Sequence, residues 1–211
     1  MIETALLLHI VAGFAALGAA GLALGSRKGA TWHRRAGRVY VLAMLAVSLT
    51  AFVLVAARPS IFLLVIAVFS FFLVFTGWRA GALRDGRPRL ADHLAGAAMA
   101  LTGAGMLGLG ALGLAGGGGV QSVILLVFGS IGLTLALADW RDWHAGPVTG
   151  TARIARHLTR MLAGATATLT AAVVVNLSFL PDLVIWLLPT ALITPLIFWW
   201  NARILRGAAS G

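Results

Sequence analysis

Apolar residues fall into seven long runs along the chain, separated by short polar connections. Each run can cross roughly 30 Å of hydrocarbon as an α-helix, which rises about 1.5 Å per residue. Because a bilayer core offers no water to exposed backbone groups, we expect helices. The pattern predicts one all-α domain over residues 1–211, a polytopic membrane bundle of seven transmembrane helices. They are predicted at Thr4–Gly25, Tyr40–Ala57, Ser60–Trp78, Leu94–Leu114, Val120–Ala138, Leu158–Asn176 and Leu183–Trp200.

The composition supports a membrane protein. Hydrophobic residues make up 60% of the 211 residues and charged residues only 10%, whereas soluble domains carry about 25% charged residues. The net charge of +10 could suit nucleic acid, but the charges lie in short loops between apolar runs. We therefore expect a lipid bilayer, and no nucleic acid, as partner. The chain has no cysteine, which excludes disulfides and thiolate metal sites.

The positive charges predict an orientation. Fifteen of the sixteen Lys and Arg residues lie in the loops after the first, third and fifth predicted helices or in the C-terminal tail, and Arg58 alone lies on the other side. Positive loops stay in the cytoplasm, so the N-terminus is predicted outside and the C-terminus inside. We expect a multi-pass protein of the bacterial inner (plasma) membrane. Six of the seven tryptophans lie at the same boundary, as in an aromatic belt.

A basic loop containing tryptophan, followed by a histidine and an apolar helix, occurs three times. The histidines are His33, His93 and His157. If the three helices are neighbours, three imidazoles would meet at one depth of the bundle. The second and third copies align best and cross the membrane in the same direction, which predicts parallel repeats. The expected units are hairpins of helices 1–2, 3–4 and 5–6, with the last helix closing the bundle.

These histidines suggest a cofactor, either haem b or a divalent metal such as zinc. Haem needs two axial ligands on facing helices, and the candidates are His33, His157 and His93, with His9 on the outer side. Three histidines and an open position form a catalytic zinc site, here predicted from His33, His157 and His144. No CxxCH motif is present, which excludes covalent c-type haem. The histidines form no compact local motif, so either site depends on the fold.

Four aspartates lie among these histidines, and two roles stay open for them. They could accept hydrogen bonds from metal-bound imidazoles, or they could pair with the surrounding arginines. No nucleophile, dinucleotide or phosphate-loop motif is present, so the sequence assigns no enzyme activity. The four aspartates are Asp85, Asp92, Asp139 and Asp142.

His9 lies inside the first predicted helix, where an ionisable residue is costly. We expect it to bond to Asn176 or Thr190, or to bind a cofactor. Two further functions remain possible from the sequence. One is a small-solute transporter or channel gated at Pro189 and Pro195, with His9 in the pathway. The other is an accessory structural subunit that joins a membrane complex or a homo-oligomer.

Small residues on the fourth predicted helix indicate close packing of helices. They recur every four residues, which places them on one helix face. A second helix can approach its backbone closely there. The four residues are Gly96, Ala100, Ala104 and Gly108.

Several separated motifs occur in order along nearly the whole chain. They are His9–Gly13, His33–Tyr40, Phe69–Arg79, Ala91–Asp92, His157–Met161, Ala171–Asn176, Trp186–Thr190 and Thr194–Ile197. Together they resemble a bacterial family of predicted multi-spanning membrane proteins of unknown function. The resemblance implies an inner-membrane protein and supplies no activity and no catalytic residue. The family favours tryptophan after Asp92, where this chain has His93, which makes His93 the weakest of the three repeated histidines as a ligand.

Overall fold

In the computed structural model, which describes residues 2–177 and 179–209, the chain forms seven α-helices joined by short connections. All seven are long and apolar enough to cross a membrane, which confirms the prediction of an all-α protein with seven candidate spans. They are α1 (Ile2–Gly25), α2 (Thr31–Ala57), α3 (Ile61–Ala82), α4 (Leu90–Ala115), α5 (Val120–Ala145), α6 (Gly150–Asn176) and α7 (Asp182–Ala209).

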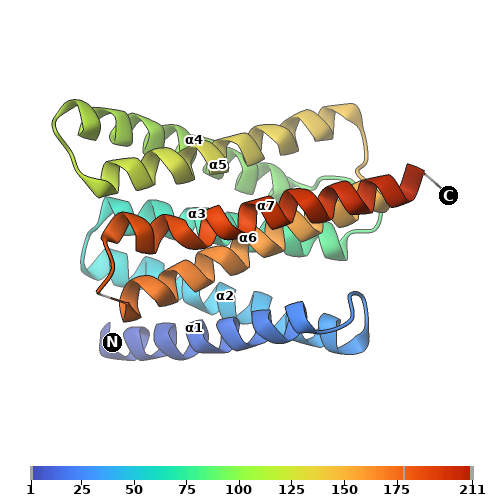
Figure 1. Cartoon of the computed structure of the whole chain (residues 1–211), viewed down its shortest axis with the longest axis horizontal. Coiled ribbons are helices and arrows are strands. Elements are labelled where there is room, and N and C mark those ends of the chain that lie inside the picture. Colours follow the sequence, from blue (N-terminus) through green and yellow to red (C-terminus); the bar gives the residue numbers. More distant parts are fainter. Residues whose placement is uncertain (1, 178, 210–211) are drawn as a thin grey trace.

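The helices run alongside one another, with α1 and α2 at one edge, α4 and α5 at the other, and α3, α6 and α7 between them (Figure 1). Helix α6 packs against α3, α7 and α1. The expectation of a packed hairpin of helices 5 and 6 is wrong. Among the described residues, the backbones of α5 and α6 do not pack against each other, because α3 and α7 lie between them and α5 pairs with α4.

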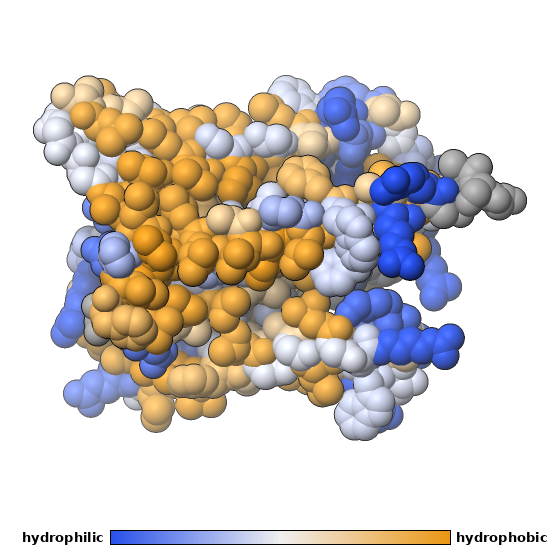
Figure 2. All heavy atoms as spheres, in the orientation of Figure 1, coloured by the Kyte–Doolittle hydropathy of each residue, from blue (hydrophilic) through white to orange (hydrophobic). Residues whose placement is uncertain are grey.

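The predicted helix boundaries fail mainly at one end of the bundle. Helix α2 begins at Thr31 instead of Tyr40, α6 begins at Gly150 instead of Leu158, and α7 continues to Ala209. The added turns are rich in arginine, which forms helices well but lowers hydropathy. This end, which carries fifteen of the sixteen Lys and Arg residues, is the basic end. Figure 2 shows the densest group of hydrophilic residues there, beside the C-terminus.

Large apolar side chains cover the flanks of the bundle. Leu101, Leu112 and Val175 are more than two-thirds exposed, and Figure 2 shows a continuous hydrophobic surface between the two ends. Such a surface suits contact with lipid chains. Lipid chains are as apolar as leucine, so helices gain little from hydrophobic burial against each other and must associate through close packing and polar contacts.

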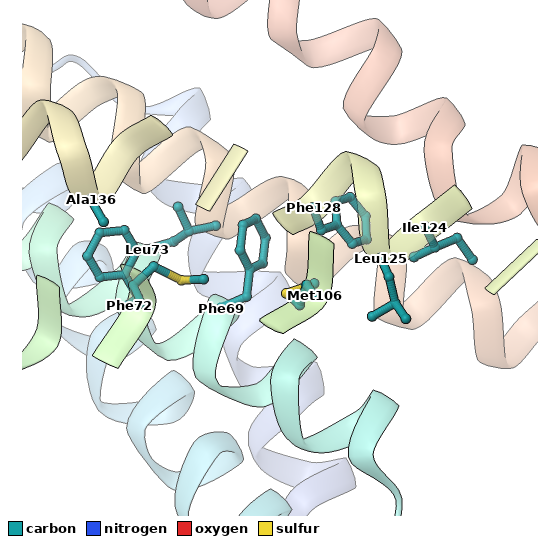
Figure 3. Packing of buried hydrophobic residues seen from close by; sticks show 9 residues of the cluster. Phe69, Phe72, Leu73, Met106, Ile124, Leu125, Phe128 and Ala136 are labelled. Atoms are coloured by element: carbon teal, nitrogen blue, oxygen red, sulfur yellow. The ribbon is translucent and has the colours of Figure 1, made fainter. Parts of the chain in front are cut away.

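Two apolar clusters fill the interior. The larger joins α3, α4 and α5, and within it the rings of Phe69 and Phe128 stack with centroids 5.4 Å apart (Figure 3). Met99 and Met106 of α4 are fully buried in this cluster. The smaller joins α1, α2 and α3, where Ala16 lies against a layer that includes Tyr40. The central helix α3 contributes to both clusters and so connects the two edges of the bundle.

Glycines bring α4 and α5 into backbone contact. A Cβ atom at Gly103 would lie 3.1 Å from the carbonyl oxygen of Gly129, and one at Gly129 would lie 3.0 Å from that of Gly103. The buried glycines of α4 are Gly96, Gly103 and Gly110, seven residues apart. The predicted four-residue face is therefore wrong beyond Gly96 and Ala100. A seven-residue spacing follows the seam of two helices that wind around each other.

We predict that Gly103→Ala destabilises the protein and that Gly105→Ala does not. The methyl group at position 103 would press on the α5 backbone, and overpacking costs about 1–3 kcal/mol. A Cβ atom added at Gly105 would meet no atom of another element within 4 Å, so alanine there adds helix propensity alone. Thermal unfolding in detergent measures both. Equal melting temperatures for the two variants would contradict the packing described.

Candidate cofactor site

Two of the predicted ligands, His33 and His157, lie together at the basic end. Their ring centroids are 6.5 Å apart and their planes meet at 79°. His33 comes from the first turn of α2, and His157 lies eight residues into α6. In the described residues the backbones of α2 and α6 do not touch, and the two helices meet through side chains, as where Tyr40 and Thr168 share a hydrogen bond of 3.2 Å. Both are half-buried.

Each of these imidazoles is oriented by a backbone carbonyl of a neighbouring helix, α1 for His33 and α3 for His157. The Nδ1 atom of His33 lies 3.0 Å from the carbonyl oxygen of Ala23 on α1. The Nδ1 atom of His157 lies 2.8 Å from that of Gly77 on α3. A carbonyl only accepts, so Nδ1 is the protonated donor in both rings and Nε2 keeps its lone pair. This tautomer, fixed by a backbone carbonyl, is typical of histidines that bind a metal through Nε2.

Two glycines of α3 make room for side chains of α6, and one of these side chains is His157. A Cβ atom at Gly81 would lie 2.8 Å from Nδ1 of His157, and one at Gly77 would lie 2.9 Å from Cβ of Arg160. Neither glycine was predicted from the sequence to have a role. Their spacing, Gly77-x-x-x-Gly81, is a signal for close helix approach and could have indicated them.

The other two histidines of the basic end do not complete a metal site. His93 is exposed and lies edge-on to Trp143, with centroids 4.5 Å apart. His144 is also exposed, and its Nδ1 donates to the carbonyl of Trp140, one turn earlier in α5. In the described part of the chain, no three His, Asp or Glu side chains are grouped so that they could hold a metal ion. The three-histidine site predicted from His33, His157 and His144 is thus not assembled there.

His9 lies away from the basic end and serves the contact between α1 and α2. Its Nδ1 lies 3.1 Å from the carbonyl oxygen of Val47 and 3.0 Å from Oγ1 of Thr50. The expected bond to Asn176 or Thr190 is wrong. Asn176 donates to Ala172 within α6, and among the described residues α1 packs against α2 and α6 but not against α7.

The aspartates of the basic end pair with arginines, which was one of the two roles left open for them. Asp139 and Arg160 are both 3% exposed, with 2.8 Å between Oδ1 and Nη2. Arg160 also donates to the carbonyl of Leu135 and lies 4.8 Å above the ring of Phe72. Asp142 pairs with Arg156 at 2.6 Å. These bonds join α5 to α6 where their backbones stay apart.

Asp92 forms a further ion pair, which joins α3 to α4. Arg79 donates to its two oxygens over 2.7 and 2.5 Å, and the backbone N–H of Arg89 donates to Oδ2 over 2.8 Å. A bidentate pair of this kind fixes direction as well as distance. The carboxylate therefore caps the start of α4 and holds the end of α3 against it.

No family model matches the chain, and no curated protein or solved structure does so either. The resemblance to a bacterial family of unknown function stays a prediction from the sequence.

We predict that Asp139→Asn lowers stability strongly, whereas Asp85→Asn does not. Breaking one partner of a buried pair leaves Arg160 without its counter-charge and costs roughly 3–5 kcal/mol. Asp85 and Arg89 are 50% and 62% exposed, and such pairs contribute at most about 1 kcal/mol. Melting temperatures in detergent compare the two. A similar loss in both variants would refute the structural role of the buried pair.

Proposed function

We propose that this protein is an integral membrane haem protein in which His33 and His157 provide the two axial ligands. The observation that supports it is the pairing of two imidazoles from different helices, 6.5 Å apart, each with Nδ1 donating to a carbonyl. Two axial imidazoles on one iron, with bonds of about 2 Å, have ring centres about 6 Å apart. The free Nε2 atoms are the ones that would bind.

The number of grouped ligands favours haem over zinc. A structural zinc ion takes four protein ligands and a catalytic one takes three. In residues 2–177 and 179–209 the site brings together two histidines and no third His, Asp or Glu. Haem iron receives its other four ligands from the porphyrin, so two protein ligands are sufficient.

Six-coordinate haem with two histidines supplies one-electron transfer. In this chain, His33 and His157 would hold the iron. The carbonyls of Ala23 and Gly77 would keep both imidazoles in the binding tautomer and direction. Gly81 would keep the space in which the His157 ring lies.

The test is the visible spectrum of protein purified from cells supplied with a haem precursor. We expect a sharp Soret band, stoichiometric iron, and the α and β bands of a low-spin haem on reduction. His33→Ala and His157→Ala should each abolish the low-spin spectrum. His93→Ala and His144→Ala are matched controls from the same end of the bundle and should keep it.

A colourless, iron-free and well-folded wild-type protein that takes up no added haemin would refute the proposal. So would an unchanged low-spin spectrum in either the His33→Ala or the His157→Ala variant.

We also propose that the protein lies in the bacterial inner membrane with the basic end in the cytoplasm. The support is the asymmetry of the sixteen Lys and Arg residues. The chain has no cysteine, so one introduced thiol reports its own side. In intact cells, a membrane-impermeant maleimide should label Gly119→Cys and spare Ser26→Cys until the cells are lysed. The reverse labelling would invert the orientation.

A further inference from the structure

A half-open cavity of about 40 Å³ lies at the basic end between α3, α4, α5 and α6. Its wall includes the ends of α3 and α5, the starts of α4 and α6, and both loops between them. This volume exceeds what a single water molecule needs. The cavity lies where helices meet loops, at the level expected for lipid headgroups.

The two loops beside the cavity are joined to each other. The backbone N–H of Val148 donates to the carbonyl of Gly86 over 3.1 Å. Gly86 has a φ of +63°, and a Cβ atom there would overlap the carbonyl of Val148. Glycine is therefore required at this position by both backbone conformation and space. The contact gives the cavity a defined wall made from two loops.

The lining of the cavity carries excess positive charge. Four arginines and two aspartates line it, a difference of +2. Asp92 is held by Arg79, and Asp139 by Arg160 and Arg156. Both carboxylates are thus already neutralised by partners. The remaining charge can act on a ligand.

The excess comes from Arg87 and Arg153. Among the described residues, neither has a carboxylate within 4.0 Å of its side-chain nitrogens. Arg153 is fixed by donating through Nη1 to the carbonyls of Ala80 and Gly81, over 2.9 and 3.0 Å. That leaves the other nitrogens of its guanidinium as donors. Arginine presents planar pairs of donors that match phosphate oxygens.

We infer that this cavity binds a phosphate-bearing anion between Arg87 and Arg153. Two sources share this chemistry, the headgroup of an anionic phospholipid and free inorganic phosphate. Basic pockets between membrane helices on the cytoplasmic side favour anionic headgroups. Trp143, which also lines the cavity, has the amphipathic ring that suits this depth. Neither His33 nor His157 lines the cavity, and the inference does not depend on the proposed cofactor.

The experiment titrates the purified full-length protein in neutral detergent and follows its melting temperature. The probes are inorganic phosphate at constant ionic strength, phosphatidylglycerol, and phosphatidylcholine as the neutral lipid. We expect a saturable rise in melting temperature with phosphatidylglycerol or with phosphate, and none with phosphatidylcholine. A response to phosphatidylglycerol alone assigns the lipid headgroup, and a response to inorganic phosphate assigns the free anion.

Variants connect the response to the cavity. Arg87→Gln should raise the ligand concentration at half-saturation about tenfold, because one charge-assisted hydrogen bond is lost. Arg87→Gln/Arg153→Gln should raise it further. Arg87 makes no side-chain ion pair within the described residues, so its single variant tests binding without disturbing the fold. Arg38→Gln/Arg84→Gln removes the same charge outside the cavity and should bind like the wild type.

Two results would overturn the inference. The first is the absence of a saturable response to both phosphate and phosphatidylglycerol. The second is the same ligand concentration at half-saturation in the cavity variants and in Arg38→Gln/Arg84→Gln. Binding would then depend on the net charge of the protein and not on the cavity.

Discussion

The buried pair of Asp139 and Arg160 connects parts of the bundle that backbone packing leaves apart. Helix α5 belongs to the α4–α5 edge, and α6 lies at the centre against α3 and α7. Within the part of the chain that the structure describes, their backbones do not meet, yet the carboxylate and guanidinium lie 2.8 Å apart. A charge at this depth is costly unless it is paired. The pair therefore favours the one arrangement in which both charges find partners, and α6 carries His157 into place with Arg160.

Glycines allow neighbouring helices to pack closely. Gly77 and Gly81 bring α6 close to α3, as Gly103 and Gly129 bring α4 close to α5. In a bilayer, contact at this distance gains dispersion energy that lipid chains cannot match. Two features consequently fix the position of the His157 ring. The missing side chain at Gly81 leaves space for the ring, and the carbonyl of Gly77 accepts its hydrogen bond.

The sequence predicted the number of helices well, and also their boundaries at the end opposite the basic end, where the predicted limits Ala57, Val120 and Asn176 are the observed ones. It did not predict the lateral order of the helices. The hydropathy of a segment predicts its depth in the membrane but not which helices pack against it. The three repeated histidines could be assigned to one depth, but only α2 and α6 point theirs toward each other. Helix α4 lies at the far edge, and His93 lies against Trp143 instead.

Polar partners were hard to predict for the same reason. His9 was expected to bond across to α6 or α7, yet it bonds to α2. The aspartates were easier, because each lies among several arginines and any compact arrangement would pair them. The spacing of small residues was misjudged on α4, where alanines and glycines occur at both four-residue and seven-residue intervals. Only packing against α5 selects the seven-residue set.

The carbonyl that orients His33 belongs to Ala23, in the last turn of α1. The direction of that imidazole is therefore coupled to how far α1 extends through the bilayer. Membrane helices respond to a thinner or thicker hydrocarbon layer by tilting or shifting. A shift of α1 relative to α3 would carry the acceptor of His33 along the membrane normal, while Gly77 kept His157 in place. The relative placement of the two imidazoles thereby becomes sensitive to bilayer thickness.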